Sequence, residues 1–341
     1  MKYLSFVVPS YNSEAYLNKC IDSLLKGGED VEIIIVNDGS KDRTKEIAED
    51  YMAKNPSIVK VINKENGGHG SGVNYGLKNA TGVYFKVVDS DDWVDEDAYK
   101  KFLTTIKENY GKQILPDLYF TNFVFEHVED HTSAVQSYKS KFPVNRLFTW
   151  KEAKRFNQAE FLMMHALTYK TQIIRDSQMV LPEHTFYVDN IFTYQPLAYV
   201  KSMYYLDLNF YRYFIGRSDQ SVNYKNMVKR YDQQLRVISI LTNLYTLDQL
   251  KSLSRKHYKY MIHDLVIKEF LTLFFVTADG NKEKEKAYKD YWSNFKKSNS
   301  KLYRKIRYRT YFVLPSFLIK PVKKLAVMSG YKLVCKAKRW G

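Results

Sequence analysis

The chain has 341 residues, of which 45% are hydrophobic and 16% aromatic, and its formal net charge is +16. This much apolar material excludes an intrinsically disordered or low-complexity protein. The only two cysteines, Cys20 and Cys335, exclude a disulfide framework and indicate a reducing compartment. No apolar run reaches the roughly 18 residues of a membrane-spanning helix, and the first residues are too weakly apolar for a signal peptide. We therefore expect neither.

The first 115 residues alternate between strand-like and helix-like segments. Short apolar runs predict strands at residues 4–8, 33–36, 58–62 and 83–88. The helical segments between them are one capped by Asn12 or Ser13 and ending at Leu25, one capped by Ser40 and ending near Ala53, and one ending near Ala80. Strands that alternate with helices of this length indicate an α/β fold with a mostly parallel sheet.

The remainder of the chain divides into three parts. Residues 116–225 mix helices with short strands, and residues 226–300 are predicted to be a mainly helical extension. Residues 301–341 hold eight Lys and four Arg but no Asp or Glu, so they carry +12 of the net charge. Because bulky apolar residues accompany these cations, we expect this tail to associate with an anionic membrane surface. A nucleic acid is the rival partner, which we do not expect, and a packed or solvated terminus is the third alternative.

A dense acidic cluster follows the fourth predicted strand. Asp89-Ser90-Asp91-Asp92 comes directly after the apolar run 83–88. Ligands of open α/β sheets bind at the carboxyl edge of the strands, which is where this cluster falls. Repulsion makes such a cluster costly unless a cation offsets it, and Mg²⁺ bridging a diphosphate is a common reason for carboxylates on a loop. A solvated acidic turn is the alternative.

A glycine-rich loop precedes the third predicted helix. In Asn66-Gly67-Gly68-His69-Gly70-Ser71-Gly72, the glycines allow close backbone approach, and the helix N-terminus favours an anionic phosphate. The loop is neither a Walker A motif nor the dinucleotide-binding G-x-G-x-x-G, so ATPase and dehydrogenase functions are excluded. His69 is either a ligand or an ordinary hydrogen-bonded loop histidine.

Five short segments in one order resemble the GT-A glycosyltransferases of family 2. They are Phe6–Asn12, Ile35–Ser40, Asn66–Gly68, Asn74 with Gly76-Leu77, and Asp89–Trp93. The resemblance is strong over residues 5–93 and looser beyond residue 115. It implies a GT-A fold, a UDP-sugar donor, inversion at the anomeric carbon and a divalent metal, Mg²⁺ or Mn²⁺. Residues 1–115 would then bind the nucleotide sugar, and residues 116–225 the acceptor.

The resemblance also implies roles for individual residues. Asp91 would bind the metal, and Asp92 would support it or cap the following helix. Arg217 and Gln220 would belong to a mobile loop over the diphosphate. Asp38 would accept the imide N–H of uracil, or would be only a turn or cap aspartate. The donor-binding residues implied are Pro9, Tyr11, Asn12, Asp38, Asn66, Gly67, Gly68, Asp89, Ser90, Arg217 and Gln220.

Inverting transfer needs a general base that takes the proton of the acceptor hydroxyl. The family places an acidic pair in its second half, and here the pair reads Val188-Asp189, which departs from the usual Glu-Asp. The second acid carries the role, so Asp189 is the expected base and Glu183 the alternative. Asp189 is also a candidate helix cap. Trp93 and His165 are weaker acceptor-side candidates, and His165 could equally be a core histidine.

Taken together, these features predict a single-addition glycosyltransferase. The chain lacks the Q-x-x-R-W box and the membrane helices of processive synthases. We expect it in the cytoplasm, peripheral at the inner membrane face, acting on a lipid-linked, cell-wall or capsular glycan. The alternatives are a polyprenyl-phosphate sugar transferase on the same fold and a non-catalytic module that binds nucleotide sugars or polymer.

Overall fold

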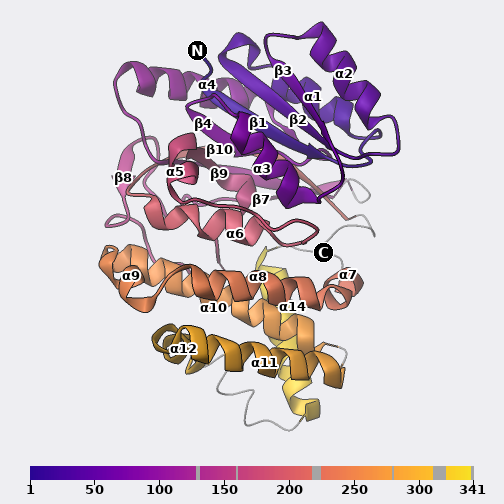
Figure 1. Ribbon diagram of the computed structural model, residues 1–341. Helices are drawn as coiled ribbons and strands as arrows, with labels where there is room; N and C mark the ends of the chain where they lie inside the picture. Colours follow the sequence, from indigo (N-terminus) through magenta and orange to yellow (C-terminus); the bar gives the residue numbers. More distant parts are fainter. Residues whose placement is uncertain (128–130, 159, 217–223, 279, 310–319, 339–341) are drawn as a thin grey trace. The chain divides into compact units, whose positions relative to one another are not determined.

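The computed structural model describes residues 1–127, 131–158, 160–216, 224–278, 280–309 and 320–338 (Figure 1). The chain forms two compact units. The first contains Met1–Lys154 and Met163–Ile215, and the second contains Arg155–Leu162 and Gly216–Gly341. The first unit is an α/β unit and the second is helical.

The α/β unit is built on a ten-stranded sheet. Eight of its strands follow the order β3-β2-β1-β4-β9-β6-β10-β5, while β7 pairs with β6 and β8 with β10. Four parallel strands form its first half: β1 (Leu4–Ser10), β2 (Val31–Asp38), β3 (Val59–Lys64) and β4 (Tyr84–Val87). Every residue of β1, β2 and β4 is buried, as expected for parallel strands covered on both faces. The predicted α/β sheet is confirmed, and all four predicted strands are present.

The second half of the sheet is mixed. β9 (Leu167–Lys170) runs antiparallel to both β4 and β6 (Leu118–His127), and β10 (Ser202–Ile215) runs parallel to β6. The short strands at its margins are β5 (Trp93–Val94), β7 (Thr132–Gln136) and β8 (Leu147–Thr149). Because β10 pairs with β5, it lies next to the acidic loop that joins β4 to β5.

Helices connect the strands. They are α1 (Leu17–Leu25), α2 (Thr44–Lys54), α3 (His69–Asn79), α4 (Glu96–Gly111), α5 (Thr171–Asp176) and α6 (Asp189–Tyr194), with 3-10 turns η1 (Gly28–Asp30), η2 (Met164–Ala166) and η3 (Pro196–Tyr199).

Two predicted helix caps are wrong. α2 begins at Thr44, where Asp42 Oδ1 accepts from the Thr44 N–H at 3.0 Å, while Ser40 Oγ accepts from the Asn12 N–H at 3.1 Å. α1 begins at Leu17 without any side-chain cap. The predicted cap residues instead join the first two strand–helix loops to each other.

Glu32 is a buried carboxylate at the start of β2. Its Oε1 accepts from Ser5 Oγ at 2.6 Å, from the Thr81 N–H at 2.5 Å and from the Gly82 N–H at 3.1 Å. Its Oε2 accepts from Lys60 Nζ at 2.7 Å. One side chain therefore ties β1, β3 and the turn before β4 to β2.

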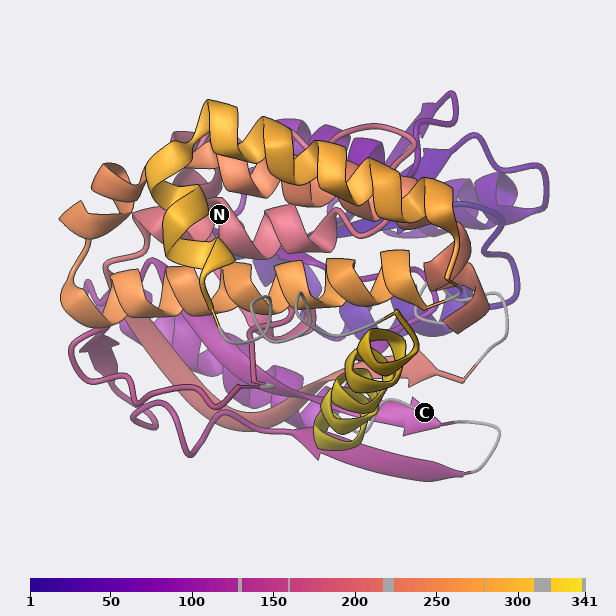
Figure 2. The same ribbon diagram turned by 90° about the horizontal axis from the view of Figure 1, so that it is seen from below.

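The second unit is helical, as predicted. Its helices are α7 (Tyr224–Lys229), α8 (Tyr231–Leu244), α9 (Leu247–Ser252), α10 (Arg255–Thr277), α11 (Lys282–Ser298), α12 (Ser300–Arg307) and α14 (Lys320–Lys338). Figure 2 shows α10 and α11 along their lengths. Buried residues occupy most of α10, including an Asp264–Lys268 ion pair and Glu269, which accepts from the Tyr291 hydroxyl. None of the helices in the described ranges is apolar over a length that would cross a bilayer.

Candidate active site

The acidic loop that joins β4 to β5 is fastened to β10. Asp92 is buried, and its Oδ2 accepts from the Tyr211 hydroxyl at 2.5 Å while its Oδ1 accepts from the Phe214 N–H at 2.8 Å. The same Tyr211 oxygen accepts from the Asp89 N–H at 3.2 Å. Asp92 therefore does not cap the following helix, because Asp95 does so by accepting from the Ala98 N–H at 3.0 Å.

Burial and the neighbouring charges of Asp91 and Asp89 raise the pKa of Asp92 well above its usual range, although its two hydrogen bonds oppose this. The Cys20 thiol of α1 also donates to the Asp89 carbonyl at 3.7 Å, and Ser13 and Ser90 share a hydrogen bond of 2.7 Å. These contacts hold the loop in place, while the side chains of Asp89, Ser90 and Asp91 stay half-buried.

His69, the first residue of α3, faces the acidic loop. Its Nε2 lies 2.8 Å from Asp89 Oδ1. Burial lowers the pKa of His69, but the charge of Asp89 and its hydrogen bond, with the charges of Asp189 and Asp91, outweigh that effect and raise it. Three carboxylates from two segments, the acidic loop and the start of α6, therefore act on one imidazole, and Asp89 is in direct contact with it.

The glycine loop is organised by Asp38 at the end of β2. Asp38 Oδ1 accepts from Lys64 Nζ at 2.6 Å and the Gly67 N–H at 2.9 Å, and Oδ2 accepts from the Gly68 N–H at 2.7 Å. Asn66 Nδ2 adds a fourth contact at 3.2 Å. Gly68 has φ of +82°, a conformation that other residues rarely adopt, so glycine is required there. All four acceptor positions of Asp38 are occupied by the protein itself.

The segment 181–188, which precedes the predicted base, is docked on α3. Asn74 exchanges two hydrogen bonds with Leu181, and the His184 N–H donates to the Gly67 carbonyl at 2.7 Å. Ser71 Oγ donates to Glu183 Oε1 at 2.8 Å. Asp189 follows as the half-buried first residue of α6, where Val188 holds the N-cap position without a side-chain bond. The glycine loop and the base segment are thus one hydrogen-bonded assembly.

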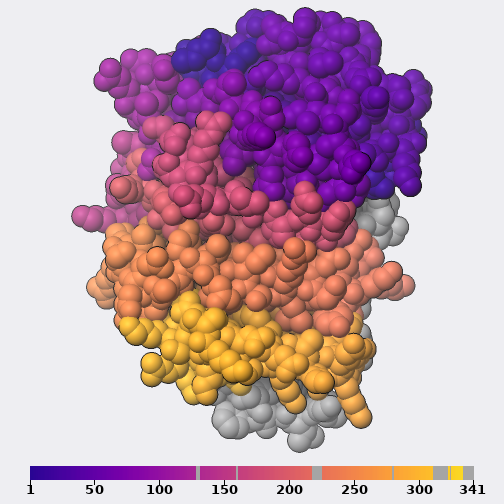
Figure 3. Space-filling model, in the orientation of Figure 1, coloured from indigo at the N-terminus to yellow at the C-terminus, as the bar shows by residue number. Residues whose placement is uncertain are grey.

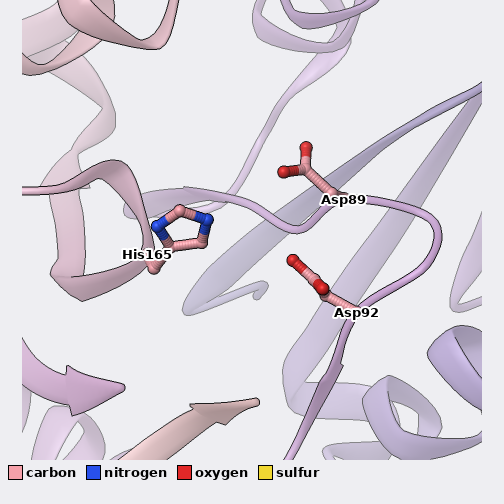
Figure 4. A group of neighbouring side chains, drawn as sticks. All are labelled: Asp89, Asp92 and His165. Atoms are coloured by element: carbon pink, nitrogen blue, oxygen red, sulfur yellow. The ribbon is translucent and has the colours of Figure 1, made fainter. Parts of the chain in front are cut away.

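His165 lies in η2 beside the acidic loop. Its ring stacks on Tyr213 at 4.2 Å between centroids, and its Nδ1 is buried with no hydrogen-bond partner among the described atoms. Burial lowers the pKa of His165 to about 4, against the charge of Asp89, so the ring is neutral at pH 7. Figure 4 shows the ring turned towards Asp89 and Asp92.

In the part of the chain that the structure covers, Asp89, Asp92 and His165 are the one group of side chains that could hold a metal ion. Their possible ligand atoms lie within 4.8 Å of one another. A neutral imidazole and carboxylates are donors that suit Mn²⁺, so the chemistry fits the expected metal. The oxygens of Asp92 are, however, already hydrogen-bonded. Asp91, the predicted ligand, lies on the same loop but outside this group, and its role stays a prediction.

Lys86 is a buried cation on β4 that the sequence pattern conceals within an apolar run. Its Nζ donates to the His165 carbonyl at 2.7 Å and the Leu167 carbonyl at 3.2 Å. Burial lowers the pKa of Lys86 to about 7. The side chain holds η2 in place and, through it, His165.

The other predicted residues are spread around this centre. Tyr11 is 48% exposed after β1, and Asn12 Oδ1 accepts from the Lys41 N–H at 2.9 Å. Pro9 lies in β1 against Gly72 of α3. Trp93 lies in β5 with Lys19 Nζ 3.0 Å from its ring centroid. Arg217 and Gln220 lie outside the described residues.

The structure thus places Asp89 against His69, whose pKa the charges of Asp91 and Asp189 also raise, and Asn66–Gly68 against Asp38. Four residues that complete this arrangement were not assigned roles from the sequence: Lys64, Asn74, Lys86 and Tyr211. Asn74 was part of a recognisable motif, so a signal existed for it, whereas no periodicity or spacing marks Tyr211 as the partner of Asp92.

The family described as Glycosyl transferase family 2 matches residues 5–175, which is half of the chain. The chain belongs to this family. It is 45% identical to the glycosyltransferase EpsJ of Bacillus subtilis over 107 residues, 31% of each chain. It is 38% identical to the minor teichoic acid biosynthesis protein GgaB of the same organism over 108 residues, 31% of this chain and 12% of GgaB. Among three curated relatives, the aligned part spans 31%, 55% and 64% of their length.

A solved structure supports the fold over the whole chain. Residues 1–349 of S. aureus TarS, crystallised with UDP-GlcNAc, superpose with a TM-score of 0.66 at 20% identity, covering 99% of this chain and 92% of that one. The predicted GT-A fold with a helical C-terminal region is therefore confirmed. The identity is too low for this likeness to carry a substrate.

Proposed function

We propose that this family 2 glycosyltransferase moves one sugar from a UDP-sugar to a hydroxyl of a lipid-linked, cell-wall or capsular glycan, with inversion. The observation that carries the proposal is the contact of His69 Nε2, at the start of α3, with Asp89 Oδ1 of the acidic loop at 2.8 Å, which joins the glycine loop to the acidic loop. The charges of Asp91 and Asp189 act on the same imidazole and raise its pKa. UDP-GlcNAc is the first donor to test, because TarS was crystallised with it. The likeness to GgaB, a minor teichoic acid biosynthesis protein, supports a teichoic-acid type of acceptor.

On the donor side, the diphosphate would lie at the N-terminus of α3, where the backbone N–H groups and the helix dipole favour negative charge. The exposed Tyr11 ring would flank the base. His69 would sit between the diphosphate and Asp89, with a raised pKa that favours its cationic form beside phosphate. Mg²⁺ or Mn²⁺ held by Asp91 would supply Lewis-acid stabilisation of the leaving group.

On the acceptor side, Asp189 would take the proton as the hydroxyl attacks the anomeric carbon. Its backbone is held by α6 and by the base segment that Asn74 docks on α3. Glu183 is the alternative, but its Oε1 already accepts from Ser71. Asp189 Oδ1 also accepts, from Asn190 Nδ2 at 3.5 Å, so these hydrogen bonds do not separate the two acids, and variants of each must.

The experiment incubates the purified chain with a panel of nucleotide sugars and Mn²⁺ or Mg²⁺, with and without EDTA, and measures nucleoside diphosphate release and donor binding by titration. We expect one UDP-sugar to be hydrolysed slowly and Asp91→Ala and EDTA to abolish this hydrolysis. Asp189→Asn should leave donor binding intact and lower transfer to a hydroxyl acceptor by at least about 100-fold.

Two outcomes would replace the proposal. If Asp189→Asn costs little and a polyprenyl phosphate is the acceptor, the chain is a polyprenyl-phosphate sugar transferase. If donors bind without any turnover in the presence of glycan acceptors, it is a binding module.

A further inference from the structure

The net positive charge of the chain comes from its second part. Residues 216–341 contain 28 Lys and Arg against nine Asp and Glu, a net charge of +19, whereas residues 1–215 contain 25 against 28, a net charge of −3. So one-sided a distribution creates a field that attracts polyanions. The described residues of the helical unit have no part in the proposed transfer step, so that step does not account for the charge.

Within the described helices, the cations are dense where α11 ends and α12 begins. Residues 296–309 hold seven Lys and Arg and no acidic residue. Lys301 pairs with Asp248 at 2.6 Å, and Arg307 lies 5.6 Å from the Trp292 ring. The other five are exposed and have no ion-pair partner in the described ranges: Lys296, Lys297, Arg304, Lys305 and Arg309. We call these five the α11–α12 cations.

The α11–α12 cations stand on a packed support. Leu302 and Ile306 are buried on the opposite face of α12, and the Tyr303 ring packs against Trp292 at 5.7 Å and Phe295 at 5.8 Å. The two helices therefore hold the charges in place before any partner arrives. Figure 3 shows the residues of α11 and α12 at the surface of the molecule.

Bulky apolar side chains are exposed next to cations in the sequence of the same unit. Tyr308 is 71% exposed between Arg307 and Arg309. On α14, Leu325 is 68% exposed next to the exposed Lys324, while Tyr331 on the packed face stacks on Phe274 at 3.6 Å. Exposed apolar groups next to exposed cations such as Arg309 and Lys324 suit a lipid surface, since cations meet anionic headgroups and apolar groups enter the interface. Polyanion binding through charge alone would not use Leu325.

We propose that the helical unit docks on anionic lipid bilayers through the α11–α12 cations, assisted by the exposed apolar residues Tyr308 and Leu325. This deepens the proposed function, because a lipid-linked acceptor would be presented at the same surface. The docking itself does not depend on catalysis, so it can fail or succeed independently of the proposed reaction.

The test is sedimentation of the purified full chain with vesicles of phosphatidylglycerol and phosphatidylcholine in equal parts, compared with phosphatidylcholine alone. Each Lys or Arg near such a surface contributes about fivefold in affinity, so replacing the five α11–α12 cations by Gln should weaken binding by at least about 100-fold. The matched control replaces five exposed lysines of the α/β unit by Gln: Lys78, Lys101, Lys112, Lys151 and Lys154. It removes the same charge and should retain binding within a few-fold.

Leu325→Ser separates lipid docking from simple polyanion binding. It should weaken vesicle binding several-fold while leaving binding to soluble poly(glycerol phosphate) or single-stranded RNA unchanged. The proposal is overturned if neutral and anionic vesicles bind equally, if both five-residue variants lose binding alike, or if the soluble polymers bind more tightly than vesicles. UDP-sugar turnover by the α11–α12 variant is the control for folding. If turnover is retained while vesicle binding is lost, the loss belongs to docking and not to the proposed reaction.

Discussion

Asn74 and Leu181 exchange two hydrogen bonds, as two facing strand residues do: Asn74 Nδ2 donates to the Leu181 carbonyl at 2.8 Å, and the Leu181 N–H donates to Asn74 Oδ1 at 2.9 Å. The segment that begins at Leu181 has no regular structure of its own and contains two non-glycine residues with positive φ, His184 at 47° and Tyr187 at 65°. Such a segment keeps its shape only if its surroundings fix it. Asn74 is therefore a positioning residue for the proposed base.

We expect Asn74→Ala to lower kcat by about 10- to 100-fold, because the base would lose its orientation, while donor affinity changes less than about twofold. Asn74→Asp keeps an oxygen that accepts from the Leu181 N–H, so its kcat should lie between those of the wild type and Asn74→Ala. Asn79→Ala is the control, since Asn79 lies on the same helix and its side-chain amide donates to the Tyr75 carbonyl at 2.8 Å, one turn away on that helix. Titration of UDP-sugar and initial rates check this, and an equal loss of donor affinity would contradict it.

Asp38 offers a second prediction, because all four of its acceptor positions are filled by Lys64, Gly67, Gly68 and Asn66. We expect Asp38→Asn to disturb the glycine loop and so to weaken UDP, CDP and GDP by similar factors, about 10-fold or more. Lys64→Met, which removes one of those donors, should weaken them in the same uniform way.

A carboxylate that reads the base directly would behave differently. Asn can donate to the unprotonated ring nitrogen of cytosine, so Asp38→Asn would then shift the preference from UDP towards CDP. Competition titrations with the three nucleoside diphosphates separate the two roles, and a selective gain for CDP would show that Asp38 reads the base.

The predictable part of this structure is local. The strands β1, β2 and β4 are mainly apolar, and polar residues follow each of them at the carboxyl edge, so order and spacing place Asp38 and the acidic loop. The start of α2 could not be predicted, because Ser40 is engaged by the Asn12 N–H from another loop. Tyr211 and Asp92 lie 119 residues apart, and Asn74 and Leu181 lie 107 apart. Only the folded sheet brings such pairs together.

Glu269 in α10 is a buried acid whose pKa is raised by burial to about 8, although the Tyr291 hydroxyl donates to it. Its Oε2 is buried without a partner among the described atoms. Between its unfolded pKa near 4.5 and about 8, the folded state holds the proton that the unfolded state has lost. Stability should therefore fall as pH rises through this window.

We expect Glu269→Gln to remove that pH dependence and to stabilise the protein by a few kcal/mol at pH 8, because no charge has to be buried. The free energy of unfolding in urea, measured at pH 5, 6.5 and 8, tests this expectation, because these pH values span the window between the two pKa values. Asp290→Asn on the exposed side of α11 is the control and should change stability by less than about 0.5 kcal/mol at any of these pH values. A variant as pH-sensitive as the wild type would refute the assignment.

Glu32 predicts the opposite pH behaviour on the acid side. Burial alone would raise its pKa, but hydrogen bonds from Lys60, Ser5 and Thr81 outweigh burial and lower it. The folded state then binds a proton less readily than the unfolded state, so the stability that Glu32 contributes is present above its unfolded pKa near 4.5 and is lost as pH falls through the lower folded value.

Glu32→Gln keeps the shape of the side chain but removes the negative charge that Lys60 Nζ meets at 2.7 Å. It also places an amide N–H₂ group against a donor, either Ser5 Oγ or Lys60 Nζ. We expect a cost of about 1–3 kcal/mol at pH 7 that shrinks below pH 4, because the wild type then loses the same charge. Lys60→Met should reproduce only the smaller share owed to the half-exposed ammonium, and a Glu32→Gln penalty that stays constant down to pH 3 would show that shape rather than charge is at stake.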